Sequence, residues 1–185
     1  MKRSRKIAGF GLALSLAACG RKSPTSPDNF QPPDGTYRSV LKPVAGPGVG
    51  GLSVTPVPNA SRVLDVVIKV RLEGAKPNAT YLVQRAPEVG RANAADGVCQ
   101  RALGQSPWSP SDPPAVAFVT FPLPVTSGPL VAIKTQPNGN GSVDFEFVSP
   151  TIPTGTVFDV MLRLVDDATA PSVELRSECL TVTAQ

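Results

Sequence analysis

Histidine is absent from this chain of 185 residues, which also has few aromatic residues and only three cysteines. Ser-His-Asp and Cys-His nucleophilic systems use an imidazole as the base, and many zinc sites use it as a ligand. The absence therefore excludes these hydrolases, His-rich zinc centres and the chemistry of copper–zinc dismutases. No glycine-rich phosphate loop leads from a strand into a helix, so nucleotide binding has no support. We expect neither a cofactor nor a bound metal.

Long hydrophobic runs are also missing. A helix that spans a membrane needs about 20 apolar residues, whereas the longest run, residues 7–18, has about a dozen. Four basic residues precede this run, namely Lys2, Arg3, Arg5 and Lys6. A basic start followed by a short apolar core is typical of a secretory signal peptide and not of a permanent transmembrane anchor.

The apolar run ends at residues 16–19, whose sequence is Leu-Ala-Ala-Cys. This ending resembles the lipobox of bacterial lipoproteins. In that family the cysteine thiol receives a diacylglyceryl group, the chain is cut before the cysteine, and the new amino group is usually acylated too. The resemblance implies that residues 1–18 are a signal peptide and that Cys19 is the lipidation site, whose acyl chains hold the protein at the membrane. The alternative is an ordinary secretory signal in which Cys19 is incidental.

Residues 19–36, which follow the signal peptide, are rich in proline, serine and other polar residues. Such a composition buries too little apolar surface to fold, so we expect a semi-extended tether. The folded domain is then expected at residues 37–185, lipid-anchored to the cell envelope and outside the cytoplasm. Because Gly20 and not aspartate follows Cys19, the resemblance favours the outer membrane where the cell has one.

The net charge of +4 at first favours a nucleic acid or another anionic partner. Removing the four basic residues of the signal peptide from the total of 18 leaves 14, equal to the 14 acidic residues. The mature chain is therefore about neutral, and it has few aromatic side chains on which bases could stack. We expect no nucleic-acid partner, and we expect a monomer.

The two remaining cysteines, Cys99 and Cys179, form an even pair in an exported chain, which predicts a disulfide. They close a loop of about 80 residues, for which the chain-entropy model gives roughly 4 to 5 kcal/mol. A reactive or metal-binding pair is the alternative, but it lacks a C-x-x-C spacing and a histidine partner. Cys179 is in phase with Val173 and Leu175, which places its sulfur on the expected inner face.

Apolar and polar residues alternate through much of the chain, which is the pattern of half-buried strands. The clearest case is Ser61 to Glu73, in which every second residue from Leu64 to Leu72 is apolar. Asn-Gly pairs at 138–141 favour a hairpin turn. The pattern predicts an all-β fold, a single antiparallel Greek-key β-sandwich of about nine strands. The expected strands are residues 37–41, 52–57, 61–73, 79–86, 115–121, 129–135, 141–148, 155–165 and 172–183.

One segment, Leu72 to Val83, resembles the corner between strands E and F of fibronectin type III and related immunoglobulin-like domains. In that corner a Leu-x-Gly-x-x-Pro run leads to a tyrosine four residues after the proline, here Pro77 and Tyr81. The resemblance implies that the tyrosine hydroxyl bonds back to the backbone and locks the crossover between sheets. Too few residues precede the motif for the usual strands A to D, so only the corner and the immunoglobulin-like sandwich carry over.

The connection at residues 87–114 is unusually long for a compact domain, and long loops are often functional. It contains Cys99 and the only tryptophan, Trp108. Trp108 is the candidate binding residue, since buried aromatic side chains dominate binding energy. The alternative is that Trp108 covers one end of the core.

Two functions remain open. The first is a non-enzymatic binding or structural module that presents the β domain to an envelope protein or a polysaccharide. The second is a glycosidase-like envelope hydrolase that uses two carboxylates, for which Asp144 and Glu146 lie about 7 Å apart on one strand face. Alternating charge on a solvated face is a much commoner reason for such a pair, so no catalytic residue is assigned. The segments 138–144 and 166–167 could suggest calcium loops, but they are better explained as turns.

Overall fold

The computed structural model describes residues 32, 34–91, 94–104, 118–122 and 129–185. These residues form an all-β structure in which every strand pairing is antiparallel. None of the described segments is a helix of the length and apolarity that crossing a membrane requires. The ten strands are β1 (Tyr37–Ala45), β2 (Val49–Pro56), β3 (Val63–Glu73), β4 (Thr80–Pro87), β5 (Val119–Thr120), β6 (Ala132–Lys134), β7 (Gly141–Pro153), β8 (Val157–Val165), β9 (Glu174–Arg176) and β10 (Leu180–Thr183).

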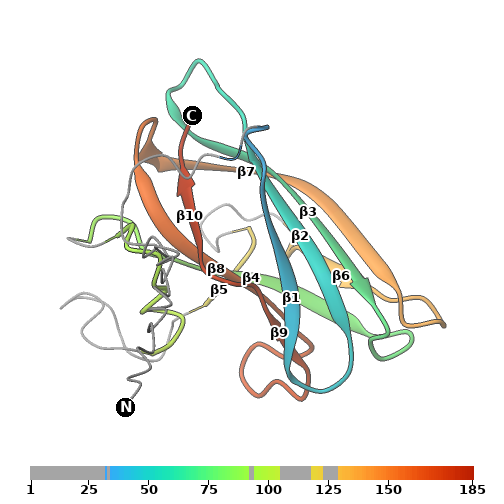
Figure 1. Ribbon diagram of the computed structural model, residues 1–185. Coiled ribbons are helices and arrows are strands. Elements are labelled where there is room, and N and C mark those ends of the chain that lie inside the picture. Colours follow the sequence, from blue (N-terminus) through green and yellow to red (C-terminus); the bar gives the residue numbers. More distant parts are fainter. Residues whose placement is uncertain (1–31, 33, 92–93, 105–117, 123–128) are drawn as a thin grey trace, which may run out of the picture.

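All ten strands belong to one sheet, which curls into a half-barrel with two walls (Figure 1). Along the sheet the order is β5-β4-β8-β9-β1-β2-β3-β7, while β10 pairs with β8 and β6 pairs with β4. We call β1, β2, β3 and β7 the first wall, and β4, β8, β9 and β10 the second wall. The two ends of the sheet approach each other at Phe121, whose ring lies 5.2 Å from that of Phe145 and 5.1 Å from that of Phe147.

Strand β1 joins the two walls because it exchanges one partner for another along its length. Its first half, Tyr37 to Leu41, pairs with β2, and its second half, from Lys42 onward, pairs with β9. The register shifts between Pro43 and Ala45. A register shift of this kind bends a strand and increases its twist. The bend turns one continuous sheet into two facing walls.

The inner faces of the walls carry the alternating apolar residues. In β3 the side chains at alternate positions from Leu64 to Leu72 are all buried, as the sequence predicts. In β7 Phe147 is buried, Phe145 packs against the same core, and Asp144 is exposed. Burying one face of each wall against the other gives one main core that extends from Tyr37 to Ala184.

The hairpin between β6 and β7 follows the Asn-Gly prediction. Gly139 has a φ of 79°, and a Cβ there would collide with the carbonyl oxygen of Ala75. Only glycine combines this backbone conformation with so close an approach. The side chain of Asn138 accepts a hydrogen bond from Asn140 N, which tightens the turn.

The last expected strand, 172–183, is two strands, and the interruption corrects the predicted position of Cys179. Arg176 pairs with Arg163 and Leu180 pairs with Val160, so the β9–β10 side has one residue more than β8 between these pairs. One extra residue reverses which face the following side chains occupy. Cys179 consequently lies outside the half-barrel, and its predicted inward orientation is wrong.

Candidate binding cavity

A cavity of about 300 Å³ lies between the two walls. Its lining is almost entirely apolar, and both walls contribute. Small-molecule sites are typically concave, mostly apolar and upward of about 300 Å³, with a few placed polar groups. The described residues that line it are Val54, Leu64, Val66, Ile68, Arg85, Pro87, Val89, Arg101, Val119, Phe121, Phe147, Ser149, Thr151, Ile152, Phe158, Val160, Leu162 and Val182.

Inward side chains of moderate size from both walls line the cavity. Val66 and Ile68 of β3 face it from the first wall, and Val160 and Leu162 of β8 face it from the second. The lining also includes Thr151, which is exposed and so lies at the edge of the cavity. The cavity therefore lies within the main core and reaches the protein surface.

Arg85 is the one cationic side chain that is buried in this apolar lining. It lies on β4 in phase with Tyr81 and Val83, and only 6% of it is exposed. Its guanidinium carbon lies 4.2 Å from the ring centroids of both Phe121 and Phe147. The two aromatic faces therefore contact the guanidinium by cation–π interactions.

The aromatic rings contact the guanidinium group of Arg85 but do not satisfy its N–H hydrogen-bond donors. Its Nη1 atom is buried and has no hydrogen-bond partner among the described residues. Among the described residues that line the cavity, none is acidic. Burial, with a smaller contribution from nearby Arg101, lowers the pKa of Arg85 to about 10. The group is still protonated at neutral pH, so the cavity contains a positive charge whose donor lacks an acceptor.

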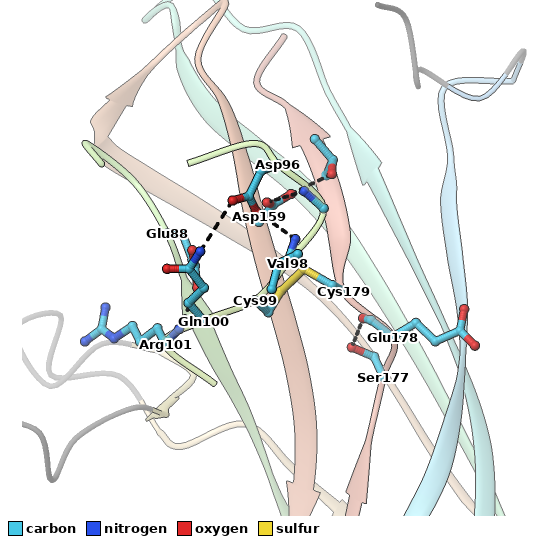
Figure 2. Close-up of a disulfide and its surroundings, with 12 residues drawn as sticks. Glu88, Asp96, Val98, Cys99, Gln100, Arg101, Asp159, Ser177, Glu178 and Cys179 are labelled. Carbon is cyan, nitrogen blue, oxygen red and sulfur yellow. Dashed lines mark hydrogen bonds between the residues drawn. A yellow bond between two sulfur atoms is a disulfide. The ribbon is translucent and has the colours of Figure 1, made fainter. Parts of the chain in front are cut away.

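The segment after β4 covers the outer face of the second wall and is fixed there by the disulfide, as Figure 2 shows. The Cα atoms of Cys99 and Cys179 are 5.5 Å apart, which confirms the predicted pairing. Cys99 packs with Ala86 and Met161 in a second, smaller core on this outer face, together with Ala102 and Phe118. The disulfide thus lies outside the half-barrel and not in the cavity.

Two buried carboxylates, one at the start of this segment and one on β8, accept hydrogen bonds from the segment's backbone (Figure 2). Glu88 accepts a 2.6 Å hydrogen bond from Arg101 N, and Asp159 of β8 accepts a 2.8 Å bond from Gly97 N. Burial raises the pKa of both Glu88 and Asp159. These carboxylates satisfy backbone donors of the covering segment, so the arrangement is structural. The part of the chain that the structure describes contains no cluster of three or more metal-ligating side chains.

The predicted corner residues lie at the end of the second wall. Tyr81 is fully buried, and its hydroxyl accepts a 3.1 Å hydrogen bond from Lys76 N. Pro77 is exposed in the connecting turn. Thr135 supports the turn from β6's end, because its hydroxyl donates a 2.6 Å bond to Lys76 O.

The other predicted functional residues do not meet at the cavity. Cys19 and Trp108 lie outside the described residues. Asp144 and Glu146 are exposed on the outer face of β7, and Asp144 forms an ion pair with Arg71 at 2.5 Å. Hydrogen bonding to Arg71 lowers the pKa of Asp144, which keeps it an ionised carboxylate.

Arg85 is not among the residues that the sequence pattern predicts to be functional. The signal was present, because Arg85 falls on the buried phase of β4, after Tyr81 and Val83, where an apolar residue is expected. A charged residue in a buried phase is rare unless it is paired. Comparison with known proteins adds no assignment: no family model, curated protein or solved structure matches this chain.

Proposed function

We propose that this protein is a cell-envelope lipoprotein whose β domain is a non-enzymatic binding module. Cys19 anchors it to a membrane, residues 19–36 form the tether, and the cavity between the walls receives a small, largely apolar molecule. The observation that carries the proposal is the cavity itself, about 300 Å³ with an apolar lining from both walls. Burying apolar ligand surface there contributes about 25 cal/mol per Å² before the costs of association.

The disulfide supports a location outside the cytoplasm. Disulfides form and persist in oxidising compartments and are rare where thiols are kept reduced. Cys99 and Cys179 are bonded, which agrees with export through the signal peptide. The lipobox-like residues 16–19 support the anchor.

The proposal extends to the fold. Two walls face each other around one main core, and Tyr81 bonds back to the backbone of the turn before it. These features support an immunoglobulin-like Greek-key sandwich, here opened on one side into a half-barrel.

The cavity is tested with the full chain carrying Cys19→Ser and the neutral fluorescent probe N-phenyl-1-naphthylamine. We expect saturable fluorescence enhancement, because an apolar cavity excludes water from the bound dye. Thr151→Phe, at the exposed edge of the cavity, is expected to weaken binding about tenfold. Thr154→Phe is the matched control, since Thr154 is equally exposed on the turn after β7 but does not line the cavity. Equal binding by both variants, or none by the parent, contradicts the proposal.

The anchor is tested in a bacterial host by fractionation and by labelling with radioactive palmitate. The unaltered chain is expected in the membrane fraction with incorporated label, and Cys19→Ser as an unprocessed or soluble precursor without label. Membrane association and normal cleavage of the Cys19→Ser chain would overturn the lipid anchor.

A further inference from the structure

Arg85 has a position that packing alone does not explain. Only 6% of Arg85 is exposed. Tyr81 and Val83, which lie on the same face of β4, are ordinary core residues. A buried charge is expensive unless it is paired and hydrogen-bonded. A leucine or methionine would fill the same space without that cost.

The aromatic contacts of Arg85 satisfy only part of its chemistry. Phe121 and Phe147 each lie at 4.2 Å from the guanidinium carbon. Rings at that distance interact with the charge through their faces, but they accept no strong hydrogen bond from the N–H groups in the guanidinium plane. Nη1 is buried and has no hydrogen-bond partner in the described part of the chain, so it is available to a molecule that enters the cavity.

The surroundings select an anion as the partner of that donor. The described lining contains two cationic residues, Arg85 and Arg101, and no acidic residue. Two buried carboxylates, Glu88 and Asp159, accept backbone hydrogen bonds of the covering segment instead. No ion pair with Arg85 occurs among the described residues.

We infer that the cavity binds a single-chain amphiphile with a carboxylate head; this inference rests on the proposed function. The acyl chain lies along the apolar lining, and the carboxylate accepts hydrogen bonds from Arg85. The guanidinium fork suits a planar carboxylate, which it can bind through two donors. A cavity of 300 Å³ has the volume of about ten water molecules, which corresponds to a chain of about ten carbons.

The pairing also explains how an unpaired cation is tolerated. In the empty cavity, burial lowers the pKa of Arg85 to about 10. A bound carboxylate favours the charged form and brings that pKa back toward its ordinary value. The ligand thus supplies a counter-charge that the described lining does not provide.

Calorimetric titration of the full chain carrying Cys19→Ser, with the disulfide formed, compares three ligands of equal chain length. These are decanoate, 1-decanol and decylammonium at pH 7.5. We expect decanoate to bind at least about tenfold more tightly than decanol, which is about 1.4 kcal/mol, and decylammonium to bind most weakly. Arg85→Met is expected to abolish the preference for decanoate and to leave decanol binding within about threefold of the parent.

Arg71→Met is the control, because Arg71 is exposed on the outer face of β3 and does not line the cavity; it should leave the preference unchanged. Equal affinities for decanoate and decanol in the parent would overturn the inference and leave the proposed function standing. If none of the three binds, the proposed function fails as well. Should Arg85→Met not fold, the decanoate-to-decanol ratio of the parent still decides.

Discussion

Each face of the second wall packs an arginine against phenylalanine, with different consequences. Arg163, on the outer face, lies 4.2 Å from the ring of Phe118, the same distance that separates Arg85 from its rings on the inner face. Arg163 also donates 2.7 Å and 3.1 Å hydrogen bonds to Gln84 and Glu174. Arg85 has no such partner among the residues that the structure describes, and its Nη1 finds no acceptor there.

Arg163 therefore has a structural role, whereas Arg85 is available to bind a ligand. Burial lowers the pKa of Arg163, although its bond to Glu174 opposes the shift. Burial alone would raise the pKa of Glu174, but hydrogen bonds from Arg176 and Arg163 outweigh it and lower that pKa. On the outer face Arg163 and Arg176 each have a carboxylate partner in Glu174, whereas Arg85 on the inner face pairs with none of the described carboxylates.

The largest expected effect comes from removing the disulfide that covers the outer face. The double change Cys99→Ser/Cys179→Ser should lower the free energy of unfolding by about 2 to 5 kcal/mol, measured by urea denaturation. Protease sensitivity should rise within residues 87–114. Decanoate binding should persist, since the disulfide does not line the cavity. Two free thiols per unfolded, unreduced Cys19→Ser chain would show that the bond is not formed.

Arg163→Met tests the structural arginine. It leaves the Gln84 oxygen without its donor and Glu174 with Arg176 as the remaining partner at 2.6 Å. Because a buried group that loses its partner is destabilising, we expect a loss of about 2 to 3 kcal/mol by urea denaturation, with the preference for decanoate retained. A change smaller than about 0.5 kcal/mol would remove the distinction between the two arginines.

Asp166 is a carboxylate that, unlike Arg85, has several hydrogen-bond partners among the described residues, because its neighbours donate hydrogen bonds to it. Burial alone would raise its pKa, but bonds from Ser172, Val173 and Lys76 outweigh it and hold the pKa far below the ordinary value. As pH falls, the unfolded chain takes up the proton first, so this contribution is complete above about pH 4 and is lost below it.

Asp166→Asn should therefore be about 1 to 2 kcal/mol less stable than the parent at pH 7. The difference should shrink progressively below about pH 4, as followed by thermal unfolding at a series of pH values. A constant difference from pH 7 to pH 2 would mean that the charge of Asp166 does not contribute.

Arg85→Met has the smallest expected effect on stability and the opposite sign. Removing an unpaired buried charge while keeping its volume should raise the free energy of unfolding of the ligand-free protein by about 1 kcal/mol. A loss of about 2 kcal/mol or more would place Arg85 in the same structural class as Arg163. Thermal unfolding of both variants without ligand makes this comparison directly.

Much of the fold could be predicted from local pattern. Each of the nine expected segments contains at least one strand, and the alternating residues of β3 and β7 face the core as predicted. These features depend on residues two positions apart on the same strand, so a linear sequence displays them. The disulfide could be predicted as well, because only two cysteines follow the lipobox-like residues 16–19 and two cysteines can pair in only one way.

The candidate binding cavity was harder to predict from the sequence. Arg85 and Arg163 both occur within alternating strands, and nothing local shows that one finds a carboxylate and the other does not. The facing of Cys179 was mispredicted because one extra residue between β9 and β10 reverses the pleat, and that residue is recognised only from the pairing with β8.

The sequence by itself determined where most strands lie, which face of β3 is buried and how Cys99 and Cys179 pair, because each follows from the kinds of residue and their spacing along the chain. The tertiary structure alone decided that the sheet curls into a half-barrel, that its walls leave a cavity, and that Arg85 is enclosed there without an acceptor. These depend on strand register and on contacts between residues far apart in sequence, such as Arg85 with Phe147. The sequence specifies the chemistry of each side chain, but the packing of the two walls decides which partner each side chain contacts.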